Sequence, residues 1–193
     1  MVKLKIYLFR HGQTYFNRDK RFTGWMDSKL TTQGIRDAKK VAQKLKDKKI
    51  DVAFCSRLTR SKHTLYEVLK FHPECKKIIV DDRIIERSYG DFQGQYHKGF
   101  IKRHGKELFD KYHRAYDFPP PNGESVKMVE KRVNSFIKDL LVRMKKDRVN
   151  VAISAHGNSM RPFRKYFEKL SVKEMGKLEN PWDDYFEYSV EVK

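Results

Sequence analysis

Two short stretches of this sequence each place a histidine directly after an apolar run. Residues 8–14 read LFRHGQT, and residues 151–158 read VAISAHGN. If both runs are parallel strands of one sheet, His11 and His156 lie at the same carboxyl edge, where open α/β sheets bind their ligands. A single histidine at a strand end is more often a hydrogen-bonded structural residue than a catalyst. The matching pair is therefore the stronger indication of a reactive site.

Arginines accompany these histidines: Arg10 precedes His11, and Arg60 follows the apolar run VAFC at the start of an expected helix. The planar guanidinium group suits phosphate oxygens, whereas clustered cations without an anion repel one another. A histidine near its reference pKa of about 6.5 is largely neutral at pH 7 and can attack phosphorus. We therefore predict a phosphohistidine on His11, held by the two arginines and His156. Gly12, which has no side chain, would let the substrate approach the backbone.

The leaving oxygen also needs a proton donor, and the stretch DDRIIERSYG offers three carboxylates. Glu86 is the preferred candidate, while Asp81 and Asp82 lie closer to the end of the preceding apolar run. The alternative for Glu86 is an ordinary surface salt bridge with Arg83 or Arg87, which would contribute little to stability. These residues alone leave both interpretations open.

The formal net charge of +18 predicts an anionic partner. The lysines of residues 37–49 are interleaved with Ala, Val and Leu, which is typical of the solvated face of an amphipathic helix. No RNP-type, zinc-finger or basic-zipper pattern accompanies the charge, so we expect a small phosphorylated metabolite and no nucleic acid. No apolar run approaches membrane-spanning length and no signal peptide is recognisable, so no membrane partner is expected.

No metal ligand set is expected, because HExxH, Asp-rich loops and clustered Cys/His spacings are missing from the sequence. A GxxxxGK[ST] phosphate loop is missing as well, which argues against a P-loop nucleotide enzyme. Cys55 and Cys75 form no CxxC pattern and no disulfide framework, which indicates reduced thiols in a cytoplasmic protein.

The order of apolar and helical patterns predicts an α/β fold of three layers, with a mostly parallel sheet flanked by helices. All of residues 1–193 are expected to form a single domain. The last apolar run alternates with charged residues, which indicates an edge strand with one face in water. Strands are expected at 6–9, 52–55, 78–80, 151–154 and 185–192, and helices at 33–47, 57–70, 125–145 and 157–169.

Residues 95–124 interrupt this alternation of strands and helices. The part from 105 to 124 contains several aromatic residues, three consecutive prolines and an Asn-Gly turn signal. We predict a stiff lid, inserted in the domain, that passes over the sheet edge. The open alternative is a surface loop whose aromatic side chains form a satellite core.

Taken together, these motifs resemble the histidine phosphatase superfamily, in particular its cofactor-dependent phosphoglycerate mutase branch. The resemblance covers nearly the whole chain and is specific, because seven motifs occur in the expected order. They are LFRHGQTYFN, FTGWMDSKLTTQG, CSRLTRSKHTL, ERSYGDFQG, RAYDFPPP, GESVKMVEKRV and AHGNSMRPF.

The resemblance implies a role for each matching residue. His11 is the phosphorylated nucleophile, Glu86 is the proton donor, and Arg10, Arg60 and His156 form the phosphate pocket. It also implies metal independence and a homodimer. The positions implied to line the substrate site are Asn17, Thr23, Gly24, Arg87, Tyr89, Arg114, Gly157 and Asn158.

Three departures from the mutase pattern bear on activity. A lysine of that pattern is replaced by His97, with Lys98 one residue later, and an arginine pair is replaced by His113-Arg114. Each change tends to replace a permanent cation by a mostly neutral ring, which would hold a doubly phosphorylated compound less firmly. The third departure is length: PPP meets NGES directly and the chain stops at SVEVK. Less cover over a phosphohistidine favours hydrolysis.

We therefore expect a metal-independent phosphatase that needs no cofactor and acts on a small phosphorylated acid such as phosphoserine or 3-phosphoglycerate. The alternative is a phosphoglycerate mutase that uses 2,3-bisphosphoglycerate as its cofactor. A non-catalytic binder of phosphorylated ligands is a third interpretation. His11→Ala distinguishes it from an enzyme, because a binder has no turnover to lose.

Overall fold

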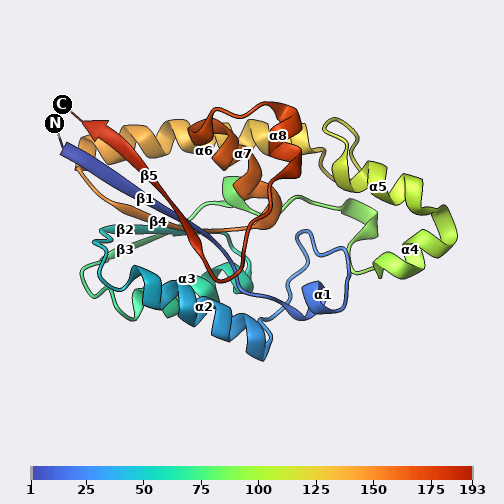
Figure 1. The fold of residues 1–193 in the computed structure, drawn as a ribbon, viewed down its shortest axis with the longest axis horizontal. Coiled ribbons are helices and arrows are strands. Elements are labelled where there is room, and N and C mark those ends of the chain that lie inside the picture. The colour runs from blue at the N-terminus through green and yellow to red at the C-terminus, as the bar shows by residue number, and fades with distance from the viewer. Residues whose placement is uncertain (1, 193) are drawn as a thin grey trace.

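The structure, a computed structural model, describes residues 2–192 and has a five-stranded sheet at its centre (Figure 1). The strand order is β3-β2-β4-β1-β5, in which β5 alone runs antiparallel to its neighbour. The predicted edge position of the last strand is confirmed. The strands are β1 (Val2–Arg10), β2 (Val52–Cys55), β3 (Lys77–Val80), β4 (Val151–Ala155) and β5 (Tyr185–Val192).

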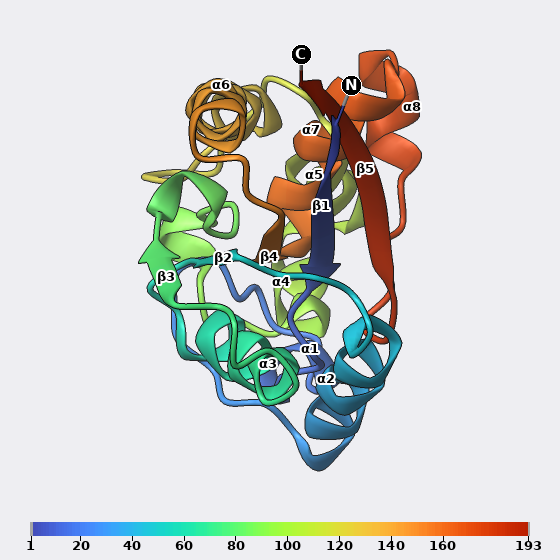
Figure 2. The ribbon, with the colours of Figure 1, turned by 90° about the vertical axis from the view of Figure 1, so that its left-hand side faces the viewer.

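Helices cover both faces of this sheet, which confirms the predicted three-layer α/β fold (Figure 2). On one face lie α2 (Thr32–Leu45) and α3 (Thr59–Leu69), and on the other lie α6 (Val126–Asp147) and α7 (Gly157–Glu168). The shorter helices are α1 (Tyr15–Arg18), α4 (His97–His104), α5 (Lys106–Arg114) and α8 (Val172–Lys177), and the 3-10 turns are η1 (Asp82–Ile84) and η2 (Gly90–Phe92).

The sequence places these helices through apolar spacing and end caps. In α2 the buried residues recur with helical spacing, and the Thr31 hydroxyl accepts the backbone N–H of Gly34. In α6 the Ser125 hydroxyl accepts the N–H of Met128 in the same way. One apolar core lies under α6 and α7, and a second lies under α2 and α3. Both faces of the central strands are therefore buried, which explains their continuous apolar runs.

The register of β1 and β4 brings the two histidines together. Arg10 is paired with Ala155, so His11 and His156 are the next residues at the carboxyl ends of neighbouring parallel strands. The N–H of His11 also donates to the carbonyl of Ala155 at 3.1 Å. Sheet register therefore fixes both side chains at one edge, as the sequence predicts.

Residues 95–124 contain two helices, α4 and α5, which lie beyond the carboxyl edge of the sheet and away from its helical layers (Figure 1). Their action as a lid stays a prediction. Their aromatic side chains pack around Phe22, whose ring centroid lies 5.4 Å from that of Phe100 and 5.7 Å from that of Phe109. The aromatic satellite core is thus confirmed, and it is built from helices instead of a loop. Gly105, with a φ of +84°, separates the two helices.

Within residues 2–192, no helix is both long enough and apolar enough to cross a membrane.

Candidate active site

His11 is oriented as a nucleophile by its own backbone neighbour. Its Nδ1 lies 2.7 Å from the carbonyl oxygen of Gly12, which can only accept, so Nδ1 carries the proton and Nε2 carries the lone pair. Burial, followed by the Arg60 and Arg10 cations, holds the pKa of His11 well below its usual value. The imidazole is therefore neutral at physiological pH, and its free nitrogen can attack.

His156 lies beside His11, with the two ring centroids 5.0 Å apart. Its Nε2 is 2.8 Å from the hydroxyl of Ser56, and its buried Nδ1 has no partner among the described residues. When the Ser56 hydroxyl donates to Nε2, the proton stays on Nδ1, the nitrogen that is left for a ligand. Burial and the nearby Arg60 cation lower the pKa of His156. The neutral ring is then a hydrogen-bond donor.

Arg60 is a fully buried cation under the two histidines. Its guanidinium donates to the carbonyls of Gly24 at 2.7 Å and Met26 at 2.9 Å, while its buried Nε lacks a partner. Burial lowers the pKa of Arg60 to about 10, so the group stays charged at pH 7. No carboxylate forms an ion pair with it in the described chain. A buried cation that has no carboxylate partner is stabilised when an anion binds beside it.

Arg10 lies on the other side of His11. It donates to the carbonyl of Asn180 at 3.1 Å, and its guanidinium lies 4.8 Å from the ring centroid of Trp182. Its Nε is buried without a hydrogen-bond partner among residues 2–192. The two residues that hold Arg10 come from the loop between α8 and β5, which sequence reasoning did not connect with the site.

Glu86 reaches the histidines from the loop after η1. Its Oε1 accepts the backbone N–H groups of Arg87 at 2.8 Å and Asn158 at 3.1 Å. The surface salt bridge considered for Glu86 is wrong, because Arg83 pairs with Asp81 and Asp139 instead. The Arg87 guanidinium donates to the carbonyl of Glu124. Glu86 therefore keeps its second carboxylate oxygen for other chemistry.

Asp81 and Asp82 are not available as proton donors. Asp81 is bound by Arg83, which lowers the pKa of the carboxyl group, and Asp82 forms an ion pair with Arg57. Both carboxylates are thus engaged in ion pairs at the end of β3, and Glu86 forms no such pair among the described residues. Glu86 as proton donor stays a prediction.

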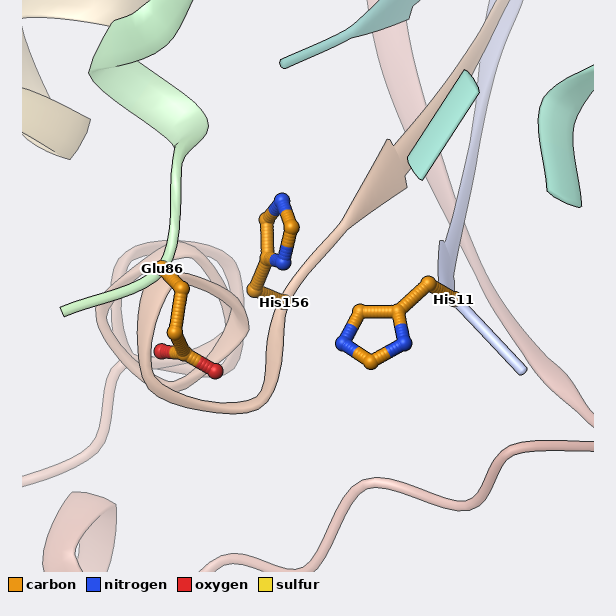
Figure 3. A group of neighbouring side chains, drawn as sticks. All are labelled: His11, Glu86 and His156. Atoms are coloured by element: carbon orange, nitrogen blue, oxygen red, sulfur yellow. The ribbon is translucent and has the colours of Figure 1, made fainter. Parts of the chain in front are cut away.

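His11, Glu86 and His156 converge on one point from three different segments (Figure 3). One ligand atom of each lies within 4.8 Å of the others, a distance at which three such groups could share a metal ion. The positive charges of Arg10 and Arg60, however, already lower the pKa of both imidazoles. The local potential therefore favours an anion over a second cation.

A cavity of about 230 Å³ opens beside this cluster. Arg21 and Arg161 line it, although sequence reasoning passed over both. The signal for Arg161 was its position one helical turn after Gly157 on α7. Predicted residues that line the cavity are Arg10, Asn17, Thr23, Gly24, Glu86, Tyr89, His97, His113, Gly157 and Asn158.

Three predicted substrate residues, Arg87, Lys98 and Arg114, do not line this cavity. Lys98 and Arg114 are exposed, because each follows its histidine by one residue and a helix turns by about 100° per residue. Arg87 is fully buried beside Tyr89, and its two terminal guanidinium nitrogens have no partner among the described residues. His11, Arg60 and His156 are buried and do not line this cavity.

Gly12 has a packing role that the sequence did not predict. A Cβ at this position would lie 2.1 Å from the carbonyl oxygen of Gly34 on α2. Glycine is needed there because the α2 backbone packs against the end of β1. Substrate approach at Gly12 stays a prediction.

Comparison with known proteins agrees with the fold and the cluster. The chain belongs to the histidine phosphatase superfamily (branch 1), whose family model matches residues 6–189. A 2,3-bisphosphoglycerate-dependent phosphoglycerate mutase of Parvibaculum lavamentivorans is 38% identical, with 87% of this chain and 81% of that protein covered. The phosphoglycerate mutase of Schizosaccharomyces pombe is 37% identical, with 89% and 83% covered.

Solved structures share the same fold. A mycobacterial glucosyl-3-phosphoglycerate phosphatase superposes with a TM-score of 0.83 at 22% identity, covering 97% of this chain and 91% of that one. Bacillus stearothermophilus YhfR gives a TM-score of 0.81 at 25% identity, with 92% and 86% covered. The neighbours in structure thus include a phosphatase, whereas the curated relatives quoted above are named as mutases.

Acidification is expected to destabilise the fold through His97 and His113. Burial lowers the pKa of each ring to about 4 from the usual 6.5, so between these values the unfolded chain binds protons that the folded chain does not. The free energy of unfolding is therefore undiminished above pH 6.5 and falls as the pH falls towards 4, by about 1 kcal/mol per ring after allowance for solvation. Thermal unfolding at neutral and acid pH measures this difference.

His97→Phe, which suits the aromatic cluster, should weaken that pH dependence. His63→Phe is the matched control, because His63 is 42% exposed on α3. If His97→Phe left the pH dependence of the unfolding temperature unchanged, protonation at His97 would not be the cause.

Proposed function

We propose that this protein is a metal-independent phosphatase that transfers the phosphoryl group of a small phosphorylated acid to His11 and then to water. In the first step, Nε2 of His11 bonds to phosphorus as the ester P–O bond breaks, and Glu86 gives its proton to the leaving oxygen. In the second step, water attacks phosphorus, Glu86 takes up its proton, and the P–N bond breaks. Phosphate and the starting enzyme result.

The observation that carries this proposal is the buried cluster itself. A neutral imidazole with a free Nε2 lies among His156, Arg10 and Arg60, and the carboxylate of Glu86 lies on the open side. Arg60 and Arg10 stabilise the charge on the transferring oxygens, where a water-poor site makes fixed cations most effective.

The carboxylate of the substrate has a candidate partner in Arg87. This guanidinium is fully buried, and two of its nitrogens are without partners among residues 2–192. Burying such a group is costly unless an anion accepts its hydrogen bonds. A phosphorylated acid supplies that second anion, which makes phosphoserine and 3-phosphoglycerate the first compounds to assay.

Two features support hydrolysis as the main outcome. His97 and His113 carry no charge at neutral pH, since the pKa of each is about 4, so they add no permanent cation for a second phosphate. The segment after Pro121 turns at once into α6, with Asn122 at a φ of +56°, and leaves little chain to cover the cavity. Less cover over the phosphohistidine favours its hydrolysis over transfer back to a substrate.

Mutase activity is the second candidate, and the curated relatives favour it. Several are named 2,3-bisphosphoglycerate-dependent phosphoglycerate mutases at 30–38% identity. Such activity would need 2,3-bisphosphoglycerate to prime His11, and Arg21 and Arg161 would be the cations left to hold its second phosphate. A homodimer and a cytoplasmic location stay predictions.

A direct assay decides between the two candidates. We expect phosphate release from phosphoserine and 3-phosphoglycerate to exceed the interconversion of 3- and 2-phosphoglycerate measured with added 2,3-bisphosphoglycerate. A known mutase run in parallel shows that the interconversion assay works. Interconversion far faster than hydrolysis would reverse the order of the two proposals.

Arg60→Lys is expected to lower kcat/KM by about 10²-fold, because an ammonium group cannot donate to two carbonyls and a phosphoryl oxygen in one plane. Steady-state hydrolysis of p-nitrophenyl phosphate measures the change. Arg57→Lys is the matched control, since Arg57 is exposed and pairs with Asp82. A near-normal rate for Arg60→Lys would place Arg60 outside the phosphate site.

A further inference from the structure

Two further hollows adjoin the cavity beside His11. They measure about 290 Å³ and 410 Å³ and lie between α5 and α8. His113 and Arg161 line the cavity and both hollows, so the three spaces meet at these side chains. We call the two hollows the α5–α8 groove. Its volume exceeds that of the cavity where the reaction takes place.

The groove is rich in cations that form no close ion pair within residues 2–192. Arg114, Lys173 and Lys177 line it, and none of the three forms an ion pair with a carboxylate in the part of the chain that the structure describes. Arg161 is held only by uncharged oxygens, those of Leu178 and Asn158. These cations are therefore free to bind an external anion.

Acidic groups in the groove do not balance this charge. Asp110 is already paired with Lys106 at 2.6 Å, which lowers the pKa of its carboxyl group. Glu179 is the other carboxylate along the lining, and it faces Arg10 as well. The net charge of the groove is positive.

The groove also has apolar walls. Met175 is buried below it, Val126 is nearly so, and Val172 is 39% exposed on its rim. Phe109 lines the other hollow. A site with apolar walls and cations suits a ligand segment that is itself part apolar and part anionic.

We infer that the preferred substrates are phosphomonoesters that carry a second anionic group on a longer, partly apolar chain or ring, with that group bound in the α5–α8 groove. This inference rests on the proposed phosphatase function and deepens it. Three-carbon acids fill the inner cavity alone, whereas a longer substrate also covers the apolar walls and reaches Lys173 and Lys177. Arg114, which was expected to line the substrate cavity, lines the α5–α8 groove instead.

The test compares two series of esters that differ only in the distal charge. The ω-phosphooxy acids from propanoate to octanoate carry a carboxylate, and unbranched alkyl phosphates of the same lengths do not. We expect kcat/KM to rise with length in the first series and to exceed that of the matched alkyl phosphate by about tenfold at the best length, as two or three exposed ion pairs would provide. Alkanediol bisphosphates show whether a carboxylate or a phosphate is the better distal anion.

Lys173→Ala/Lys177→Ala tests whether the groove causes this preference. We expect the double variant to lose most of the advantage of the long acids and to leave hydrolysis of alkyl phosphates unchanged. Lys102→Ala/Lys138→Ala removes two exposed cations outside the groove and is the matched control. Equal kcat/KM for the charged and uncharged esters would overturn the inference, and so would an equal loss on both series in the double variant.

A binding measurement tests the groove independently of the proposed phosphatase activity. Calorimetry compares ω-phosphonoheptanoate with heptylphosphonate, neither of which can be hydrolysed. Tighter binding of the first, lost in Lys173→Ala/Lys177→Ala, supports the groove even if no ester is turned over. Equal binding of both compounds contradicts it even if the enzyme hydrolyses phosphoserine.

Discussion

His11→Ala is expected to lower kcat for any phosphomonoester by at least about 10⁴-fold, the scale seen when a covalent nucleophile is removed. The reason lies in the geometry: only Nε2 of His11 combines a free lone pair with a position among Arg60, Arg10 and His156. His156 cannot replace it, because its Nε2 is engaged with Ser56. Steady-state kinetics gives the first measurement. Rapid quenching with a phosphorus-labelled substrate gives the second.

The labelling experiment separates loss of chemistry from loss of fold. The native enzyme should yield an adduct that is labile in acid and stable in base, as expected of a phosphohistidine, and His11→Ala should yield none. His11→Asn is a useful second variant, since its amide N–H can replace Nδ1–H as donor to the carbonyl of Gly12. His63→Ala, at an exposed position, should keep the adduct. Normal adduct formation in either His11 variant would remove this residue from the nucleophilic role.

Glu86→Gln is expected to slow phosphoryl transfer from alkyl phosphates by about 10²–10⁴-fold, which is the usual contribution of a positioned general acid. The amide nitrogen cannot deliver a proton to the leaving oxygen. p-Nitrophenyl phosphate needs little protonation of its leaving group, so its rate should fall far less. Pre-steady-state rates with a series of leaving groups measure this difference as a steeper dependence on leaving-group pKa in the variant.

The interpretation of Glu86→Gln requires that the loop after η1 keeps its position in the variant. Arg132 donates to the carbonyls of Ile85 and Glu86, and the indole N–H of Trp25 donates to the latter as well. These contacts involve the Glu86 backbone, so the substitution should leave them intact. Glu107→Gln, at an exposed position of α5, is the matched control. An equal loss for alkyl and p-nitrophenyl esters would show that Glu86 has a binding or structural role instead of proton donation.

Two pairs of adjacent residues show a limit of prediction from local sequence, because only one member of each pair lines the cavity. His97 and Lys98 are adjacent, as are His113 and Arg114, and the choice within each pair depends on helix phase. His97 and His113 turn towards Phe22 and the cavity, which leaves their neighbours outside. The resemblance alone identified Arg114 as a cavity residue, and α5 assigns it to the groove beside α8.

The sequence by itself determined the order of elements and which histidines lie together at the sheet edge. Continuous apolar runs require buried parallel strands, and two such runs that each end in His-Gly must place their histidines at one edge, because parallel neighbours share a direction. His11 and His156 therefore follow from local pattern and sheet register. Arg60 was found in the same way, since the helix that carries it begins directly after the next strand, β2.

Only the tertiary structure decided what surrounds those groups. Whether Glu86 forms a surface ion pair or lies buried beside the histidines depends on ion pairs elsewhere: Arg83 binds Asp81 and Asp139 instead. The contacts between Arg10 and the loop before β5 join residues about 170 positions apart in the chain. Local propensity and periodicity report on neighbours within a few residues, whereas burial, unpartnered donors and cavities arise when distant segments pack together. That is why the position of the two histidines could be read from the sequence and their surroundings could not.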